Sequence, residues 1–142
     1  MGRRRLDEEQ TAAGLLELAA DEDRNVRAAA GGALCTACDG SPEVTSAVVA
    51  LLRDPVERVR AGMSEAVTHC ANRSADIADA LFALLDEEDF SVRLNAAYAL
   101  LRWEDPRTAE AVERVGPLSR PGHEHDHRLS AIWRWEWDRN QP

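Results

Sequence analysis

The stretch Asp54-Pro-Val-Glu-Arg-Val-Arg60 decides the fold, because its pattern occurs again before and after it. Residues 21–27 read DEDRNVR and residues 87–93 read EEDFSVR, so each copy places Val five residues and Arg six residues after an acid. Successive copies lie 33 residues apart. A fixed period of this length is typical of a solenoid of stacked helical units, in which each unit packs on its neighbours.

Each unit is predicted to contain two helices, and the second unit shows why. Ser41 followed by Pro42 has the residue types of an N-cap and a first helical position, and the apolar helix that follows is expected to stop near Asp54. Asp54, with Pro55 and Glu57 behind it, is predicted to cap the second helix. That helix carries apolar side chains at 3.6-residue spacing: Val59, Met63, Ala66, Val67 and Cys70.

The units align with one another when they are overlaid at 33 residues. Apolar residues of the first helices coincide, as Leu18, Leu51 and Leu84 do, and the second helices carry small residues that permit close packing. Strand signals are absent, so the chain is predicted to be all-α, a right-handed α-α superhelix in a single domain, 1–142. The expected repeats are about 7–39, 40–72 and 73–105, followed by a degenerate capping repeat, 106–138.

The capping repeat departs from the period in a definite way. Its first helix is expected to start at Asp105-Pro-Arg107 and reach about Val115, and a loop rich in Gly and Pro follows. The segment from His127 to Asp138 then echoes the third unit at a spacing of 35 residues rather than 33. Asp126 is predicted to cap this last helix. A degenerate final unit is what a solenoid needs to close its open end.

Composition limits the classes of function. The net charge is −9 and all 17 cations are Arg, so lysine Schiff-base chemistry is excluded and nucleic acid is not the expected partner. Three cysteines are too few for a disulfide framework, and no apolar run reaches the length of a membrane span. The basic start lacks the apolar stretch of a signal peptide, so a cytoplasmic protein is expected, from a bacterium to judge by the abundance of Arg and Ala.

The recurring leucine-rich first helix, acidic turn and Val-Arg-x-x-Ala-Ala segment resembles the HEAT repeat, in particular the short HEAT-like repeat of the kind also found in bilin lyases. The resemblance covers about residues 11–105 well and 106–138 loosely. It implies that the second helices line a concave binding face. It also implies a structural ladder between adjacent repeats, made by Asp21, Arg27, Asp54, Arg60, Glu87 and Arg93. Glu87 stands where the family usually has Asp.

A metal site is the main alternative that the residues offer. His123, His125 and His127 alternate along one short stretch and provide imidazole ligands, but nothing nearby is spaced to complete the set. Cys35 and Cys38 form a C-x-x-C pair that is expected to lie inside a helix as buried small residues. No cofactor is therefore expected, and no catalytic constellation of acid, base or nucleophile can be assembled.

The candidate binding residues come from the face of the second helices opposite the core. This face is expected to expose Gly31, Gly32, Cys35, Ser64, Glu65, Thr68, Leu94, Tyr98 and Leu101, with His69 and Arg102 at its margin. Trp133 aligns with Tyr98 in the last unit. Trp133 and Trp137 share one face of the last helix while Trp135 points away, so at least one of these rings is expected to be exposed. The predicted partner-binding set is Glu65, Tyr98, Leu101, Arg102 and Trp133.

The predicted function is protein–protein interaction rather than catalysis. The chain is expected to act as a scaffold that binds a partner protein or peptide on its concave face, and a partner with a basic surface would complement its charge. An adaptor or an immunity or antitoxin-type protein fits this description, and a monomer is expected. The alternative is a metal-dependent enzyme or ligand-binding protein that uses the stretch from His123 to His127.

Overall fold

The computed structural model describes residues 2–37 and 40–142, and this part of the chain contains helices and no strand. The α-helices are α1 (Gly2–Ala19), α2 (Arg24–Ala37), α3 (Pro42–Leu52), α4 (Glu57–Ala66), α5 (Ala75–Ala83), α6 (Phe90–Arg102), α7 (Thr108–Val115) and α8 (His127–Arg139). The 3-10 turns Val67–His69 and Leu84–Asp86 extend α4 and α5. The predicted all-α class is confirmed. None of the described helices combines the length and apolar character needed to cross a membrane.

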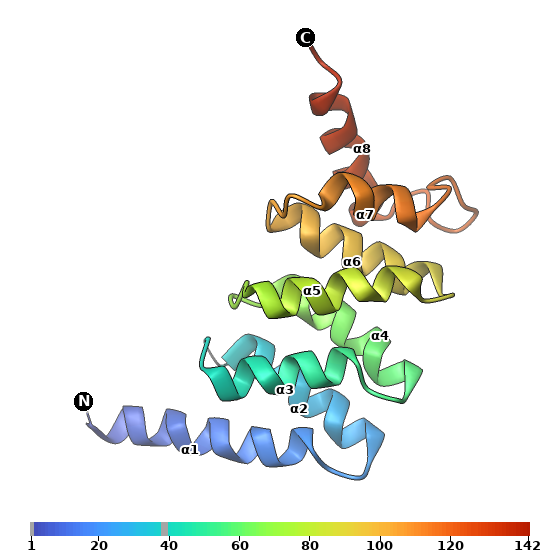
Figure 1. Ribbon diagram of the computed structural model, residues 1–142. Coiled ribbons are helices and arrows are strands. Elements are labelled where there is room, and N and C mark those ends of the chain that lie inside the picture. Colours follow the sequence, from blue (N-terminus) through green and yellow to red (C-terminus); the bar gives the residue numbers. More distant parts are fainter. Residues whose placement is uncertain (1, 38–39) are drawn as a thin grey trace.

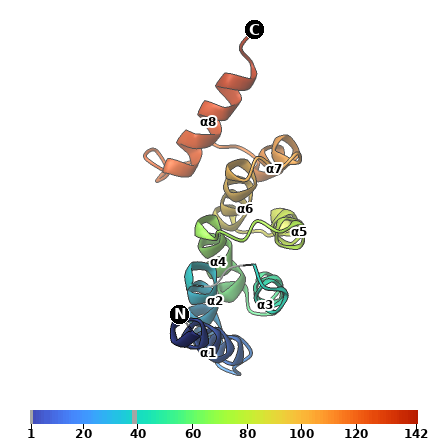
Figure 2. The ribbon, with the colours of Figure 1, turned by 90° about the vertical axis from the view of Figure 1, so that its left-hand side faces the viewer.

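The helices form two layers (Figures 1 and 2). Helices α1, α3, α5 and α7 lie side by side in one layer, and α2, α4 and α6 lie side by side in the other. Each helix of the first layer packs on the following helix of the second, so that α1 pairs with α2, α3 with α4 and α5 with α6. Residue 39, the predicted end of the first unit, and Cys38 lie outside the described residues.

The predicted start of the helix in the first layer is confirmed, but that of the helix in the second layer is wrong. Ser41 caps α3 and its Oγ accepts a hydrogen bond from the backbone N of Val44 at 3.3 Å. Helix α4 begins only at Glu57, and its N-cap residue is Val56. Asp54 does not cap it, because the Asp54 carboxylate accepts the N–H of Val56 in a tight turn and also binds an arginine of the preceding unit.

The core lies between the layers, and neighbouring units approach closely there. Val59, Met63 and Val67 are fully buried, as the 3.6-residue spacing predicts. Gly31 of α2 is buried against the next unit, where a Cβ added at this position would lie 2.8 Å from Leu51 Cδ1 and closer still to Met63 Sδ. Any side chain at residue 31 would therefore displace the Leu51 and Met63 side chains from this contact.

Helix α8 does not continue the second layer in the manner of α4 and α6. It packs on α6 and then extends away from the stack, with the C-terminus at its far end (Figures 1 and 2). Asp126 is its N-cap, as predicted, and accepts a hydrogen bond from the N–H of Arg128 at 2.9 Å. Leu129 and Ile132 bury one face of α8, whereas Trp137 is 68% exposed.

Two adjacent glycines of α2 provide a matched test of this packing. Gly31→Val is expected to lower the free energy of unfolding by about 1–3 kcal/mol, because the added methyl groups overpack the contact with Leu51 and Met63. Gly32→Val is expected to change it by less than about 0.5 kcal/mol, because a Cβ at Gly32 meets nothing within 4 Å. Urea unfolding of both variants measures the difference. An equal loss of stability in the two variants would contradict the close packing of α2 against Leu51 and Met63 at Gly31.

Candidate partner-binding surface

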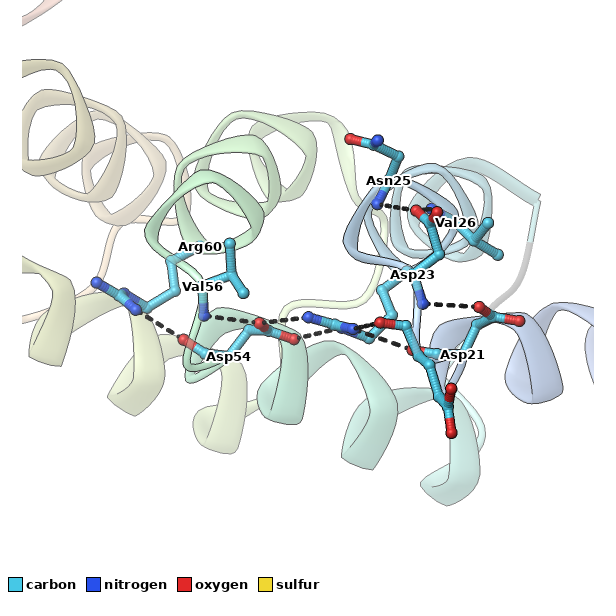
Figure 3. Close-up of polar contacts among 9 residues, drawn as sticks. Asp21, Asp23, Asn25, Val26, Asp54, Val56 and Arg60 are labelled. Atoms are coloured by element: carbon cyan, nitrogen blue, oxygen red, sulfur yellow. Dashed lines mark hydrogen bonds and ion pairs between the residues drawn. The ribbon is translucent and has the colours of Figure 1, made fainter.

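The turn between α1 and α2 and the turn between α3 and α4 are joined by one arginine (Figure 3). Arg27 donates from Nε and Nη2 to the two carboxylate oxygens of Asp54, at 2.9 and 3.1 Å. Its Nη1 donates to the carbonyl oxygen of Asp21 at 3.0 Å. The Asp54 side chain is only 6% exposed. The guanidinium therefore holds the turn of its own unit and the carboxylate of the next unit at the same time.

The second rung repeats this arrangement with a longer acid. Arg60 donates from Nε and Nη2 to the carboxylate of Glu87, and its Nη1 donates to the carbonyl oxygen of Asp54 at 2.7 Å. The extra methylene of Glu87 leaves the fork intact. Arg93 is different, because it donates to the carbonyl oxygen of Val115 at the end of α7. A backbone acceptor thus replaces the carboxylate at the third rung.

Arginine lowers the pKa of three acids that it binds in the folded chain. The Arg27 guanidinium lowers the pKa of Asp54 below its usual value, because its hydrogen bonds to both carboxylate oxygens favour the ionised form, and partial burial opposes the shift. Arg107 lowers the pKa of Asp105 in the same way. Arg128 lowers the pKa of Asp126 to about 2. The depressed values identify these acids as structural partners of arginine in the folded chain.

A polar network links α4, α6 and α8 across the second layer. Arg128 Nη1 donates to Asn95 Oδ1 at 2.6 Å and to Ser91 Oγ at 3.2 Å, while Nε and Nη2 bind the Asp126 carboxylate. Asn95 Nδ2 in turn donates to the buried Ser64 Oγ at 3.1 Å. This network fixes the start of α8 against α6, so that α8 is part of the surface that α4 and α6 form.

A groove of about 430 Å³ crosses the second layer from α2 to the start of α6. We call it the α2–α4–α6 groove. Small residues of α2 and α4 form its floor, and charged and amide side chains surround them. Its lining consists of Arg24, Asn25 and Ala28 of α2, of Arg58, Val59, Ala61, Gly62 and Glu65 of α4, and of Asp89, Ser91, Val92 and Asn95.

The predicted partner-binding residues are not all gathered in this groove. Glu65 is exposed and lines it. Leu101 is half-buried and instead lines a separate hollow of about 700 Å³ between α6, α7 and α8. Arg102 is exposed, and its Nη1 donates to the hydroxyl of Tyr98 at 3.2 Å. Trp133 is 44% exposed on α8. The set is therefore spread over the second layer and α8.

The expected exposure of this face is wrong for most of its central residues. Gly31, Cys35, Ser64 and Thr68 are buried, because α2, α4 and α6 pack against one another more closely than the overlay predicts. Leu94 is fully buried and Tyr98 is 8% exposed. His127 of α8 packs edge-on against the Tyr98 ring at 5.5 Å, and Arg102 stacks on it. Tyr98 thus supports α8 and Arg102, and its predicted contact with a partner remains a prediction.

The tryptophans of α8 are divided between its two faces, as the spacing predicts. Trp135 is half-buried against the core, and Arg139 lies over its ring at 5.1 Å. Trp133 and Trp137 are exposed on the other side. The exposed pair extends the apolar part of the surface beyond the end of the stack.

The histidines of the predicted metal stretch do not converge. His123 packs against Phe90 at the start of α6, whereas His127 packs against Tyr98, two turns further along the same helix. Phe90 and Tyr98 are about 12 Å apart along the axis of α6, so the two histidines that pack on them are held apart. His125 is exposed. Among the described residues, no group of three or more His, Cys, Asp or Glu side chains is placed to hold a metal ion.

Cys35 and Cys70 come from consecutive units and are both buried. The Cys35 thiol faces Cys70, and this contact together with burial raises the pKa of Cys35. Cys35 therefore remains a thiol, which agrees with its interpretation as a small core residue. The second cysteine of the C-x-x-C pair, Cys38, is not among the described residues.

The sequence prediction leaves out Arg24 and Arg58, although both line the groove. Arg58 lies seven residues before Glu65 and therefore falls on the same face of α4. Extending the predicted strip by two helical turns toward the start of each helix would have included it. Asn95 and Arg128 had no comparable signal, because their contact depends on where α8 crosses α6.

Comparison with known proteins assigns no function to this surface. No protein-family model matches the chain, and a search of curated proteins finds no significant match.

The first rung can be tested by removing its arginine. Arg27→Ala is expected to lower the free energy of unfolding at neutral pH, because it removes the bidentate partner of the Asp54 carboxylate and leaves only Arg60 as a nearby positive charge. Arg27→Lys is expected to recover only part of this loss, since an ammonium cannot make the bidentate contact. Urea unfolding measures both variants. Arg24→Ala, an exposed change on the same helix, serves as the control, and an equal loss there would contradict the ladder's role.

Acid should weaken the attachment of α8 through Asp126. The pKa of Asp126 is about 2 in the folded chain, and it is about 3.9 in an unfolded one. The ionised pair therefore stabilises the fold fully above about pH 4, and its contribution is lost as the pH falls toward 2. Asp126→Asn keeps an N-cap oxygen but removes the charge. The gap in melting temperature between wild type and Asp126→Asn is expected to narrow as the pH falls through this window.

The exposed Asp138 provides the control for this titration. Asp138→Asn is expected to follow the wild-type melting temperature at every pH. If the gap for Asp126→Asn stayed constant from pH 7 to 2, the charge of Asp126 would not contribute to stability.

Proposed function

We propose that the chain is a HEAT-like repeat protein, a right-handed superhelix that binds a partner protein or peptide on the concave face of its second helices. The 33-residue period supports the repeat assignment, because pairs of helices follow one another at this interval. The rungs Arg27–Asp54 and Arg60–Glu87 support it further, since each joins an arginine to the acid 27 residues later.

The α2–α4–α6 groove is the observation on which the binding proposal depends. Its floor has no long side chains, and a Cβ added at Gly62 would meet nothing within 4 Å. Glycine in the middle of a helix costs about 1 kcal/mol relative to alanine, and packing inside the chain does not require it at residue 62. A shallow floor with open space above it suits the close approach of a partner backbone.

The rim of the groove supplies the polar contacts that give such binding its specificity. Arg24 and Arg58 lie toward the starts of α2 and α4, and Glu65 lies near the end of α4. Asp89, at the start of α6, lies beside these arginines, so this end of the groove carries both signs of charge whereas Glu65 is acidic, and the difference would orient a bound segment. Arg102 and Trp133 extend the exposed surface toward α8. Tryptophan and arginine are favoured anchor residues at protein interfaces.

The role that we propose is that of a cytoplasmic binding protein, an adaptor or an immunity or antitoxin-type protein. The net charge of −9 favours a partner with a basic surface, because opposite charge accelerates encounter. The Arg, Asn, Ser, Asp and Glu side chains of the groove offer hydrogen bonds and charge to a bound segment, and we assign the groove to binding. No observation on the described residues favours the metal-dependent alternative, because His123 and His127 pack against different parts of α6 and His125 is exposed.

Selection from a peptide library tests the groove directly, because it requires no identified partner. Peptides displayed on phage are selected on the wild-type protein alone and are then tested on Gly62→Trp, a change at a position where an added Cβ meets nothing within 4 Å. Peptides that bind the groove are expected to bind Gly62→Trp and Arg58→Ala at least tenfold more weakly than wild type, because one change blocks the floor and the other removes a rim charge. Isothermal titration calorimetry measures the affinities.

Arg114→Ala is the control, because Arg114 is exposed on α7 in the opposite layer. Its affinity for the same peptides is expected to equal that of wild type. Peptides that bind wild type and Gly62→Trp equally well would place the binding face elsewhere.

A further inference from the structure

The second and third units each place a leucine at the contact with the preceding unit, and the first unit has a leucine at the equivalent position. Leu51 and Leu84 occupy one position of this interface and are 3% and 4% exposed. Leu18 occupies the same position in α1 and is 46% exposed. Leu51 is covered by α2 at Gly31. Leu18 has no such cover, because no described helix packs on that side of α1 (Figure 1).

Asp21 is the carboxylate of the same interface, and no described arginine binds it. In the next unit, Asp54 accepts the N–H of Val56 at 2.9 Å and also the fork of Arg27. Asp21 accepts the N–H of Asp23 at 2.8 Å in the same local geometry. Figure 3 shows Asp21 at the end of the row of contacts, with this single bond to its carboxylate.

The occupied copy of this interface defines what the open copy can bind. Asp54 and Leu51 receive Arg27 and Gly31, which are four residues apart and lie on one face of α2. The arginine supplies a bidentate ion pair, and the glycine permits close packing on the leucine. The contact of Arg27 and Gly31 with Asp54 and Leu51 is observed in the second unit, so it is evidence separate from the acidic residues around Asp21. The same geometry at Leu18 and Asp21 would accept the same two features.

We infer that Leu18 and Asp21 form a second docking surface, distinct from the α2–α4–α6 groove, for a helix of a partner protein that carries an arginine followed four residues later by glycine or another small residue. The open carboxylate binds the guanidinium, and the exposed leucine packs against the small residue. Glu22 and Asp23 are exposed beside Asp21 and favour a basic partner segment.

The ladder arginines of this chain do not supply the guanidinium. Arg27 and Arg60 bind the acids of the following units, Arg93 binds the carbonyl oxygen of Val115, and Arg128 binds Asp126. A second copy of the chain would have to break one of these contacts to offer a ladder arginine. Its exposed arginines Arg24 and Arg58 are also followed four residues later by a small residue, so the ultracentrifugation experiment below tests that occupant. A different protein with an unpaired arginine meets no such cost.

The α2 segment itself is the appropriate probe, because the structure shows it bound to Leu51 and Asp54. A peptide of residues 22–34 is made helical by a hydrocarbon staple between positions 25 and 29, both exposed in α2. Fluorescence anisotropy measures its binding to the full chain. We expect saturable binding that weakens at least tenfold for Asp21→Asn and for Leu18→Ser. The same loss is expected when the peptide carries R27A.

Three controls separate binding at Leu18 and Asp21 from general charge attraction, from unfolding and from binding in the groove. Glu22→Gln removes a neighbouring charge that is not part of the interface, and it is expected to leave the affinity within twofold of wild type. Asp21→Asn and Leu18→Ser are expected to stay folded with melting temperatures close to that of wild type, because Leu18 is 46% exposed and an amide oxygen at residue 21 can still accept the N–H of Asp23. The groove variant Gly62→Trp is expected to bind the stapled peptide as wild type does.

Two results would overturn the inference. The first is the absence of saturable binding to wild type, or binding that Asp21→Asn and Leu18→Ser leave unchanged. The second is a wild-type dimer in analytical ultracentrifugation that Leu18→Ser converts to a monomer, since this would assign the surface to a second copy of the chain.

Discussion

The bidentate contact between an arginine of one unit and a carboxylate of the next is the directional interaction that joins the first three units. Arg27 and Arg60 each bind the carbonyl of their own turn as well as the acid beyond it, so one side chain sets both the turn and the distance to the neighbour. The apolar core between the layers supplies most of the stabilisation, but it is non-directional. The directional contact selects one alignment of the units among the many that apolar packing permits.

The sequence predicts the period well because two separate signals coincide at it. Apolar spacing places Val59 and Met63 in the core, and the same interval returns the acid and the arginine. The start of α4 was predicted incorrectly because Asp54 carries the signature of an N-cap while its carboxylate is committed to Arg27. Residue type alone cannot distinguish a carboxylate that caps its own helix from one that binds a distant guanidinium.

The candidate surface was harder to predict than the fold, because it depends on α8. An overlay of units treats every second helix alike and therefore exposes Tyr98, whereas α8 crosses α6 and buries that ring beneath His127. In the sequence, the only sign that α8 crosses α6 differently is the spacing of 35 residues, rather than 33, between the third unit and the last segment. Glu65 kept its predicted exposure, since α4 has ordinary neighbours on both sides and no helix crosses its outer face.

The ladder also bears on how the chain acquires its structure. Both carboxylate rungs join residues only 27 positions apart, so the main polar contacts between units close short segments of chain. Short loops cost little entropy to close, and chains dominated by such contacts fold fast. Helices α1 and α8 each have neighbours on one side only, so they are expected to fray before the central helices, on a timescale that amide hydrogen exchange records.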